Sequence, residues 1–241
     1  MQILVIVAAG DQTIHESWIT KSDETILESK LDFAVIWYSD NPIPKSIILS
    51  SKYLFQKKGS KWELIKFVLK EINWHIYDYI WMPDDDLYCK SGSIQLFCNI
   101  MKENKLCLAQ PSLTEQNVQW KILIKDPTTI FRLTNFIEIQ APCFQVNILE
   151  KLLPTILDPD IKTGWGLDFV WASILKKFPK GVIDVVQMEH TRSSKKQSID
   201  YQGGGTNPFD ELFSTLKKYK VKKFKPTIIQ CISYTNIQLI E

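Results

Sequence analysis

The stretch Tyr79-Ile-Trp-Met-Pro-Asp-Asp-Asp86 indicates the fold class of this chain. Its apolar part has the length of a buried strand, and three acids follow it directly. Ligands of open α/β sheets bind outside the carboxyl ends of the strands, so we expect the acids at the ligand-binding edge. Because Asp84 and Asp86 are two residues apart on an extended backbone, both can reach one divalent ion. A solvated acidic turn is the alternative, since Asp-x-Asp is a common pattern.

The overall composition is that of an ordinary globular protein. Its 241 residues are 45% hydrophobic and 23% charged, which suits one large α/β domain. The net charge of +2 gives no reason to expect nucleic acid as a partner. Five scattered cysteines without a Cys-x-x-Cys pair favour reduced thiols and a cytoplasmic location. Met1–Ala9 is too short for a signal peptide, and no apolar run reaches the roughly 18 residues of a transmembrane helix.

Apolar strands alternate with helical patterns along the chain, as in a doubly wound sheet. Before the acids we predict strands at 3–9, 33–38 and 47–49 and a helix at 62–72 with Ser60 as its N-cap. After them we predict helices at about 93–104, 146–153 and 209–219 and strands at 106–109 and 182–186, with further apolar runs at 131–139 and 227–232. Pro154 is expected to end the second of these helices. Residues 193–207 are polar and rich in glycine, which is typical of a loop or lid.

Polar residues follow the first two predicted strands. The turn after the first strand consists of Ala8, Ala9, Gly10 and Asp11. It would present backbone donors and one carboxylate at the ligand edge of the sheet. Asp40 follows the second strand, where the ribose or base of a nucleotide is often held, and a turn-forming aspartate is the alternative. Lys61 opposes the dipole of its helix, which a bound phosphate would rationalise; a solvent-facing lysine is the alternative.

Two later stretches carry candidate substrate contacts. Glu138 lies in an apolar run, where a buried carboxylate needs a partner such as a sugar hydroxyl; an exposed edge-strand glutamate is the alternative. Gly164, Trp165 and Gly166 allow an unusual backbone shape that could form the floor of a sugar pocket. Asp168 then begins a predicted helix, where it is either a cap or a catalytic base.

His190 follows a predicted strand and stands in a polar cluster, unlike the other two histidines. An imidazole together with carboxylates is a credible ligand set for Mn²⁺ or Mg²⁺, although most single histidines bind no metal. Farther on, lysines gather between Lys217 and Lys225. These lysines could meet a diphosphate or an anionic membrane surface, and solvated charge is the alternative.

Taken together, these motifs resemble those of nucleotide-sugar-dependent glycosyltransferases of the GT-A fold. More narrowly, the chain is similar to a plant and bacterial family long catalogued only as a domain of unknown function. The resemblance covers roughly residues 33–192 and rests on Trp37–Asp40, Lys61–Trp62, Trp81–Leu87, Gln110–Pro111, Phe136–Pro142, Gly164–Phe169 and Gly181–Asp184 with His190. The triple aspartate and the last two blocks are specific in combination.

The resemblance implies one domain over residues 1–241, with a mixed, mostly parallel sheet flanked by helices. Residues from about 1 to 110 would form a nucleotide-binding half, and residues from about 111 to 241 an acceptor-binding half with the C-terminal tail. The implied metal ligands are Asp84, which also approaches the ribose, Asp86, and His190 near the diphosphate. Asp85 would position the donor sugar, Lys61 would touch the donor, and the turn 8–11 with Asp40 would hold the base and ribose.

The expected reaction is metal-dependent transfer of a sugar from a nucleoside-diphosphate sugar to a glycan hydroxyl. The family favours uridine diphosphate, with glucose as the default sugar. Asp168 would be the base of an inverting enzyme, because the Gly-Trp-Gly and acid arrangement also resembles that of metal-dependent galactosyltransferases. A sugar nucleotidyltransferase is one alternative, but the turn at residues 8–11 lacks its usual basic loop. A non-catalytic carbohydrate-binding module is another, but it would not need clustered acids and a histidine.

Overall fold

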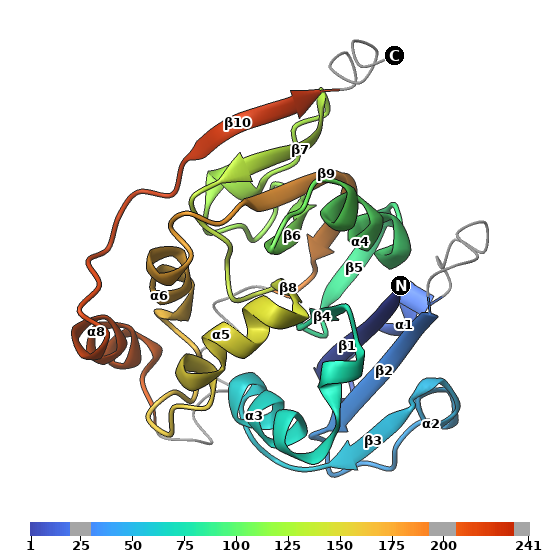
Figure 1. Ribbon diagram of the computed structural model, residues 1–241. Coiled ribbons are helices and arrows are strands. Elements are labelled where there is room, and N and C mark those ends of the chain that lie inside the picture. The colour runs from blue at the N-terminus through green and yellow to red at the C-terminus, as the bar shows by residue number, and fades with distance from the viewer. Residues whose placement is uncertain (20–29, 193–205, 234–241) are drawn as a thin grey trace.

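The computed structural model describes residues 1–19, 30–192 and 206–233 (Figure 1). Its strands are β1 (Gln2–Ala9), β2 (Lys30–Trp37), β3 (Tyr53–Gln56), β4 (Tyr79–Trp81), β5 (Leu87–Ser91), β6 (Leu108–Leu113), β7 (Thr129–Thr134), β8 (Cys143–Gln145), β9 (Lys180–His190) and β10 (Ile228–Ser233). Its helices are α1 (Glu16–Ile19), α2 (Lys45–Ser50), α3 (Lys61–Glu71), α4 (Ile94–Glu103), α5 (Val146–Ile156), α6 (Leu167–Ile174) and α8 (Pro208–Lys218), with 3-10 turns η1 (Trp74–Ile76) and η2 (Lys121–Leu123).

The strands of the described residues form one sheet in the order β10-β7-β9-β6-β8-β4-β1-β2-β3, and β5 pairs with β9. The first four strands are parallel neighbours, in the order β4-β1-β2-β3. Ile3 to Ala9 are all buried, as expected for a strand that is covered on both faces. Helix α3 packs on β1 and β2, and α5 packs on β4 and β8. Figure 1 shows α3, α5 and α6 on one side of the sheet and α4 on the other.

The rest of the sheet is mixed. β8 runs antiparallel to both β4 and β6, and β9 pairs in parallel with β6 but antiparallel with β5 and β7. The predicted α/β fold with a mixed sheet and flanking helices is confirmed, and the parallel pairing is concentrated in the N-terminal strands. Because β5 and β6 both pair with β9, the end of β9 is brought back to the segment that follows β4.

Two local predictions are wrong. The predicted strand at 47–49 is part of helix α2, of which only Ile47 is buried, and the third strand is β3. Pro154 does not end α5, which continues to Ile156. Proline lacks the N–H that would bond the carbonyl four residues earlier. Pro154 stands in the last turn of α5, and the amide of Leu157 still donates to the carbonyl of Leu153 at 2.8 Å.

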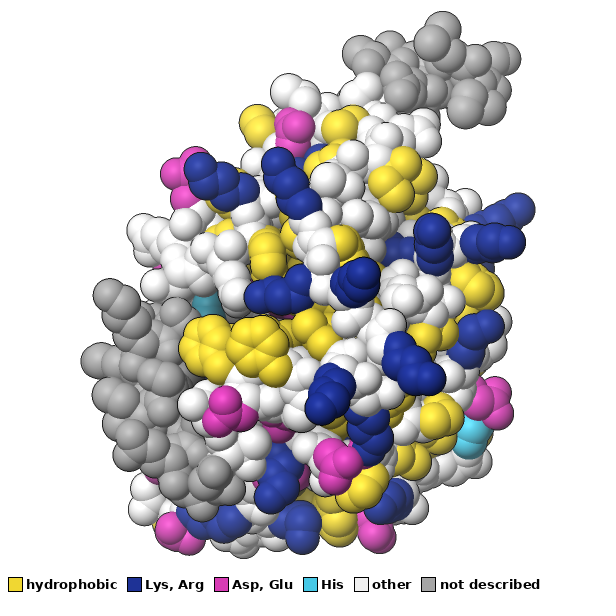
Figure 2. Space-filling view, turned by 90° about the vertical axis from the view of Figure 1, so that its left-hand side faces the viewer, with side chains coloured by type: hydrophobic (Ala, Val, Ile, Leu, Met, Phe, Trp, Pro, Cys, Tyr) yellow, Lys and Arg dark blue, Asp and Glu magenta, His cyan; other side chains and the backbone are white. Residues whose placement is uncertain are grey.

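A second, smaller apolar cluster lies between α6 and α8, apart from the main core around the sheet. It consists of Phe136, Phe169, Leu212 and Leu216, against which Trp120, Ile122, Trp165, Val221 and Phe224 pack. This cluster holds α8 beside α6 (Figure 1). Figure 2 shows exposed hydrophobic side chains close to several Lys and Arg side chains on the side of the molecule that lies to the left in Figure 1.

Two sequence predictions concern the surroundings of the protein. No helix in the described ranges combines the length and the apolar character that a membrane span requires. All five cysteines are free thiols, four of them buried and Cys231 exposed. The cytoplasmic location stays a prediction. Residues 193–205 of the predicted loop lie outside the described residues.

Candidate active site

The acid triplet is held where the end of β4 meets the end of β9. The amide of Asp84 donates to the carbonyl of Gln140 at 2.8 Å. The carbonyl of Asp86 accepts from the amide of Thr191 at 3.0 Å and from its hydroxyl at 2.9 Å. One residue farther, Leu87 pairs with His190 in the β5–β9 ladder. The backbone therefore brings the acids and the histidine together, although about a hundred residues of sequence separate them.

Asp84, Asp86 and His190 form a group that could hold a metal ion. Their ligand atoms all lie within 4.8 Å of one another. His190 Nε2 is 3.0 Å from Asp86 Oδ2, and the two side chains are only 5% and 1% exposed. Two carboxylates and an imidazole suit a divalent ion such as Mn²⁺ or Mg²⁺. The sequence prediction that these three residues converge agrees with this geometry, and metal binding itself stays a prediction.

The charges within the group compensate one another. Burial alone would raise the pKa of Asp86, but the hydrogen bond and charge of His190 hold this pKa below its usual value. Burial would lower the pKa of His190, and Asp86 raises it. The pKa of Asp84 is raised by burial, against the charge of Lys61. Asp86 therefore favours a proton on His190, which His190 would release on binding a metal ion.

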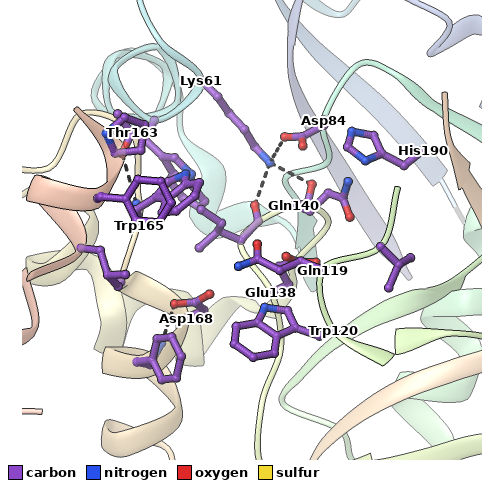
Figure 3. A pocket seen from close by; sticks show the side chains of 18 of the residues that line it. Lys61, Asp84, Gln119, Trp120, Glu138, Gln140, Thr163, Trp165, Asp168 and His190 are labelled. Carbon is purple, nitrogen blue, oxygen red and sulfur yellow. Dashed lines mark hydrogen bonds and ion pairs between the residues drawn. The ribbon is translucent and has the colours of Figure 1, made fainter. Parts of the chain in front are cut away.

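Lys61 points into the site and is not a solvent-facing lysine (Figure 3). Its ammonium donates to Asp84 Oδ1 at 2.7 Å and to the carbonyls of Ile139 and Gln140 at 2.9 Å each. It starts α3, whose predicted N-cap is confirmed: the amide of Ser60 donates to the Glu63 carboxylate at 3.0 Å. Lys61 thus joins the acid triplet to the segment that carries Glu138.

Asp85 points away from this group, toward the turn after β1. Its carboxylate accepts from the amide of Gly10 at 3.2 Å and from the hydroxyl of Tyr38 at 3.3 Å, and it pairs with Arg192. Burial raises the pKa of Asp85 to about 6, against the charge of Arg192. A β-carbon at Gly10 would lie 2.4 Å from the ring of Tyr38, so any other residue there would have to displace this ring. Contact of Asp85 with the donor sugar stays a prediction.

The predicted base and ribose contacts lie at the ends of β1 and β2. Asp11 accepts from the hydroxyl of Ser39 at 2.7 Å and from the amide side chain of Asn41 at 2.9 Å. Ala8 and Ala9 are buried within β1. The side chain of Asp40 is 91% exposed and pairs with Lys58. Whether the turn 8–11 and Asp40 bind a nucleotide is not tested by these contacts and stays a prediction.

One cavity of about 950 Å³ connects the metal-ligand group with the later candidates. Of the candidate residues, it is lined by Lys61, Asp84, Glu138, Trp165, Gly166, Asp168 and His190. In Figure 3, Glu138 lies between Asp84 and Asp168. One end of the cavity is therefore lined by Asp84 and His190, with Asp86 beside them, and the other end by Asp168 among aromatic side chains.

Asp168 and Glu138 are buried carboxylates of this cavity. Asp168 does not cap α6, because the N-cap is Gly166, whose φ of 98° favours glycine. Burial raises the pKa of Asp168 to about 7, although the amide of Phe169 donates to its Oδ1 at 2.8 Å. Glu138 is 8% exposed, so it is not an exposed edge-strand residue. Burial, with the charges of Asp168 and Asp84, raises its pKa to about 8.

The glycine loop before Asp168 is held by a residue that the sequence analysis missed. Glu211 of α8 accepts from the amides of Lys162 at 3.0 Å, Thr163 at 2.9 Å and Gly164 at 2.7 Å. A β-carbon at Gly164 would lie 2.2 Å from the ring of Trp62. In the sequence, Glu211 looks like any acid on an amphipathic helix, and no motif singles it out. Arg192, which pairs with Asp85 and Asp86, was missed in the same way.

Comparison with known proteins supports the fold. The chain is similar to the crystal structure of GalNAc-T7 with UDP, GalNAc and Mn²⁺, with a TM-score of 0.63 and 10% identity over 91% of this chain and 49% of that chain. It is also similar to the crystal structure of S. aureus TarS, with a TM-score of 0.54 and 11% identity over 91% of this chain and 43% of that chain. The chain has a GT-A-like fold.

The fold expected from the sequence resemblance is thereby confirmed. At these identities the likeness concerns the fold, and the chain spans less than half the length of either structure. A scan against family models and a search of curated proteins found no match. The function therefore has to be argued from the site.

Proposed function

We propose that this protein is a metal-dependent glycosyltransferase that uses a nucleoside-diphosphate sugar as donor and a glycan hydroxyl as acceptor. The observation that carries this proposal is the single cavity with a metal-ligand group at one end and the buried Asp168 at the other. The similarity to a protein crystallised with UDP, GalNAc and Mn²⁺ supports it and favours a uridine-diphosphate sugar. Glucose is the first sugar to test.

Donor binding is assigned to the end of the cavity with the acid triplet. Asp84, Asp86 and His190 would hold Mn²⁺ or Mg²⁺, and the half-buried carboxylate of Asp84 with the buried carboxylate of Asp86 and imidazole of His190 fits such an ion. When bound, the ion would supply Lewis-acid stabilisation of the charge on the leaving diphosphate. Lys61 fixes the orientation of Asp84 through its 2.7 Å hydrogen bond.

Proton transfer is assigned to Asp168. In inverting transfer, the acceptor oxygen forms a bond to the anomeric carbon while the bond to the nucleoside diphosphate breaks. The acceptor proton passes to the Asp168 carboxylate. Its pKa of about 7 suits this role, since a general base works best when its pKa lies near the operating pH. Glu138, Trp165 and Gly166, which line the same cavity, are assigned to contacts with the sugars.

Titration calorimetry with a panel of uridine-diphosphate sugars, with and without Mn²⁺, tests the donor assignment. We expect binding that needs both the nucleotide and the metal. Asp86→Ala should abolish the metal-dependent part, because Asp86 contributes a buried ligand. Glu103→Ala, at the exposed end of α4, is the matched control and should bind like the unmodified protein.

Three outcomes would contradict the proposal. Donor affinity that is unchanged in Asp86→Ala would refute the metal assignment. Binding of free glycan alone, without nucleotide, would indicate a carbohydrate-binding module. Release of pyrophosphate from a nucleoside triphosphate and a sugar 1-phosphate would indicate a nucleotidyltransferase.

A further inference from the structure

The segment that ends α8 and follows it carries a dense positive charge. Between residues 217 and 225 there are six lysines and no acid: Lys217, Lys218, Lys220, Lys222, Lys223 and Lys225. Because the whole chain carries +2 and this segment carries +6, the remaining residues together carry −4. The positive charge of this protein is therefore a local feature of one segment, which we call the lysine segment.

The lysine segment is anchored to the wall of the cavity. The amide of Val221 donates to the carbonyl of Leu216 at 2.9 Å, which turns the chain at the end of α8. The ring of Phe224 packs against Phe136 and Phe169, with centroids 6.3 Å and 5.2 Å apart. Phe169 immediately follows Asp168, so the anchor places the lysine segment next to the proposed base.

Most lysines of the segment have no acidic partner. Lys218 pairs with Asp158 and Asp160 at 2.7 Å each, and these contacts tie α8 to the loop after α5. The other five form no ion pair with a described residue, and all five are exposed. Lys and Arg side chains are spread over the face shown in Figure 2, with fewer Asp and Glu among them.

Lys223 is the lysine of this segment that lines the cavity, together with Asp168 and Phe169. Its ammonium lies 5.9 Å from the centroid of the Phe169 ring. Trp165 and Phe209 line the same end of the cavity, with their ring centroids 5.0 Å apart. Aromatic faces suit the apolar faces of sugar rings. The charge of Lys223 opposes the rise of the Asp168 pKa, but its ammonium forms no ion pair with a described residue and can therefore also bind an anion.

We infer that the acceptor is an anionic saccharide, whose carboxylate or phosphate group is bound by Lys223 while the rest of its charge lies along the lysine segment. This inference rests on the proposed glycosyl transfer. A cation on the cavity wall can donate hydrogen bonds to the hydroxyls of any saccharide, but its charge attracts and orients only an anionic one. The exposed lysines outside the cavity extend the same field along the path by which a charged glycan would enter.

An anionic bilayer is the competing partner for these lysines. Phe209 and Phe213 are 60% and 62% exposed on α8, next to the lysine segment. A bilayer surface, however, would engage the outward-facing lysines and would not require a lysine on the cavity wall beside Asp168. The position of Lys223 therefore favours a soluble anionic saccharide.

Titration calorimetry of the full chain with trigalacturonate, maltose 6′-phosphate and neutral maltotriose tests the inference. We expect binding of the two anionic probes that weakens with added salt, and much weaker binding of maltotriose. Lys223→Gln should lower the affinity for the anionic probe roughly tenfold, as expected for one lost charge-assisted contact that is partly open to water. Lys102→Gln, an exposed lysine of α4, is the control and should bind like the unmodified protein.

Equal affinity for maltotriose and for the anionic probes would overturn the inference. It would also be overturned if Lys223→Gln and Lys102→Gln lost the same affinity for the anionic probes. Binding to phosphatidylserine vesicles without binding to either anionic probe would assign the lysine segment to a membrane instead. Donor binding with Mn²⁺, measured on the same samples, should be unchanged in Lys223→Gln. A failure of donor binding in the unmodified protein would count against the proposed glycosyl transfer, separately from the choice of acceptor.

Discussion

The carboxylates at the two ends of the cavity differ in whether they have a cationic partner. At and behind the end lined by Asp84 and His190, every acid of the triplet has a cationic partner. These pairs are Lys61 with Asp84, Arg192 with Asp85, and His190 with Asp86. At the aromatic end, Glu138 and Asp168 have no ion pair with a described residue, and their pKa values rise to about 8 and about 7.

This difference separates two tasks within one cavity. A buried acid either keeps its charge through a partner or takes up a proton more readily. The paired acids are suited to bind a cation and, through it, a diphosphate. The unpaired acids are suited to exchange a proton or to donate a hydrogen bond near neutral pH. If the two ends act separately, a substitution at one end should leave the function of the other end unchanged.

Asp168→Asn should have the largest effect. Without a base at the aromatic end, turnover should fall by about 10²- to 10⁴-fold, the usual contribution of general acid–base catalysis. Binding of the donor with Mn²⁺ should be unchanged, because the paired acids are untouched. Transfer assays and calorimetry on the same preparation measure both quantities. Glu115→Gln, which changes an exposed acid, is the control and should keep full turnover. If Asp168→Asn also keeps most of its turnover, Asp168 is not the general base.

The pH dependence of turnover should follow Asp168. Its base form is lost as the pH falls below its pKa of about 7, so kcat should drop about tenfold per pH unit below that value and level off above it. Initial rates at saturating donor, Mn²⁺ and acceptor from pH 5.5 to 8.5 measure this. A profile that is flat across this range would show that proton transfer to Asp168 does not limit the reaction.

Glu211→Ala should destabilise the aromatic end and leave the other end intact. The substitution removes the acceptor of three loop amides, and an unsatisfied buried amide costs about 1–3 kcal/mol. Urea unfolding should show a loss of this size. The Michaelis constant for the acceptor should rise, while donor affinity should change little. Equal losses in donor and acceptor binding would mean that the two ends do not act separately.

Glu138→Gln should raise stability, by an amount that depends on pH. The pKa of Glu138 is about 8 in the folded protein, compared with 4.5 for an unperturbed glutamate. At pH values between these two, folding is coupled to uptake of a proton. The free energy of unfolding therefore falls as the pH rises through this window. Glutamine removes this loss, so the variant should gain several kcal/mol at pH 7.5 and about 1 kcal/mol at pH 5. Thermal unfolding at the two pH values measures it. The same gain at both would show that Glu138 does not titrate in this window.

The acid end could largely be predicted from the sequence. The strand before Asp84 and the strand before His190 have strong apolar patterns, and both place polar residues at a strand end. The rule that ligands bind at the carboxyl ends of strands then brings those residues together. The resemblance to GT-A enzymes indicated how the other motifs follow one another along the chain.

The aromatic end and some local structure could not be predicted. The run 47–49 is apolar but too short to distinguish a strand from a helix, and Leu49 is in fact 76% exposed. Glu211 and Lys223 act on residues about fifty positions earlier in the chain, through contacts that no local pattern encodes. Their sequence context is that of a surface helix and a solvated tail.

The pairing of β9 with β5 has a consequence for protein engineering. It places His190 beside Asp86, although a boundary near residue 110 would assign the two residues to different halves. A chimera that joins the first half of this chain to the second half of a relative would therefore draw the candidate metal-ligand group from two parents. To exchange the donor-binding residues together, the junction of the chimera would have to lie beyond Thr191. Strands β5 and β9 would then come from the same parent.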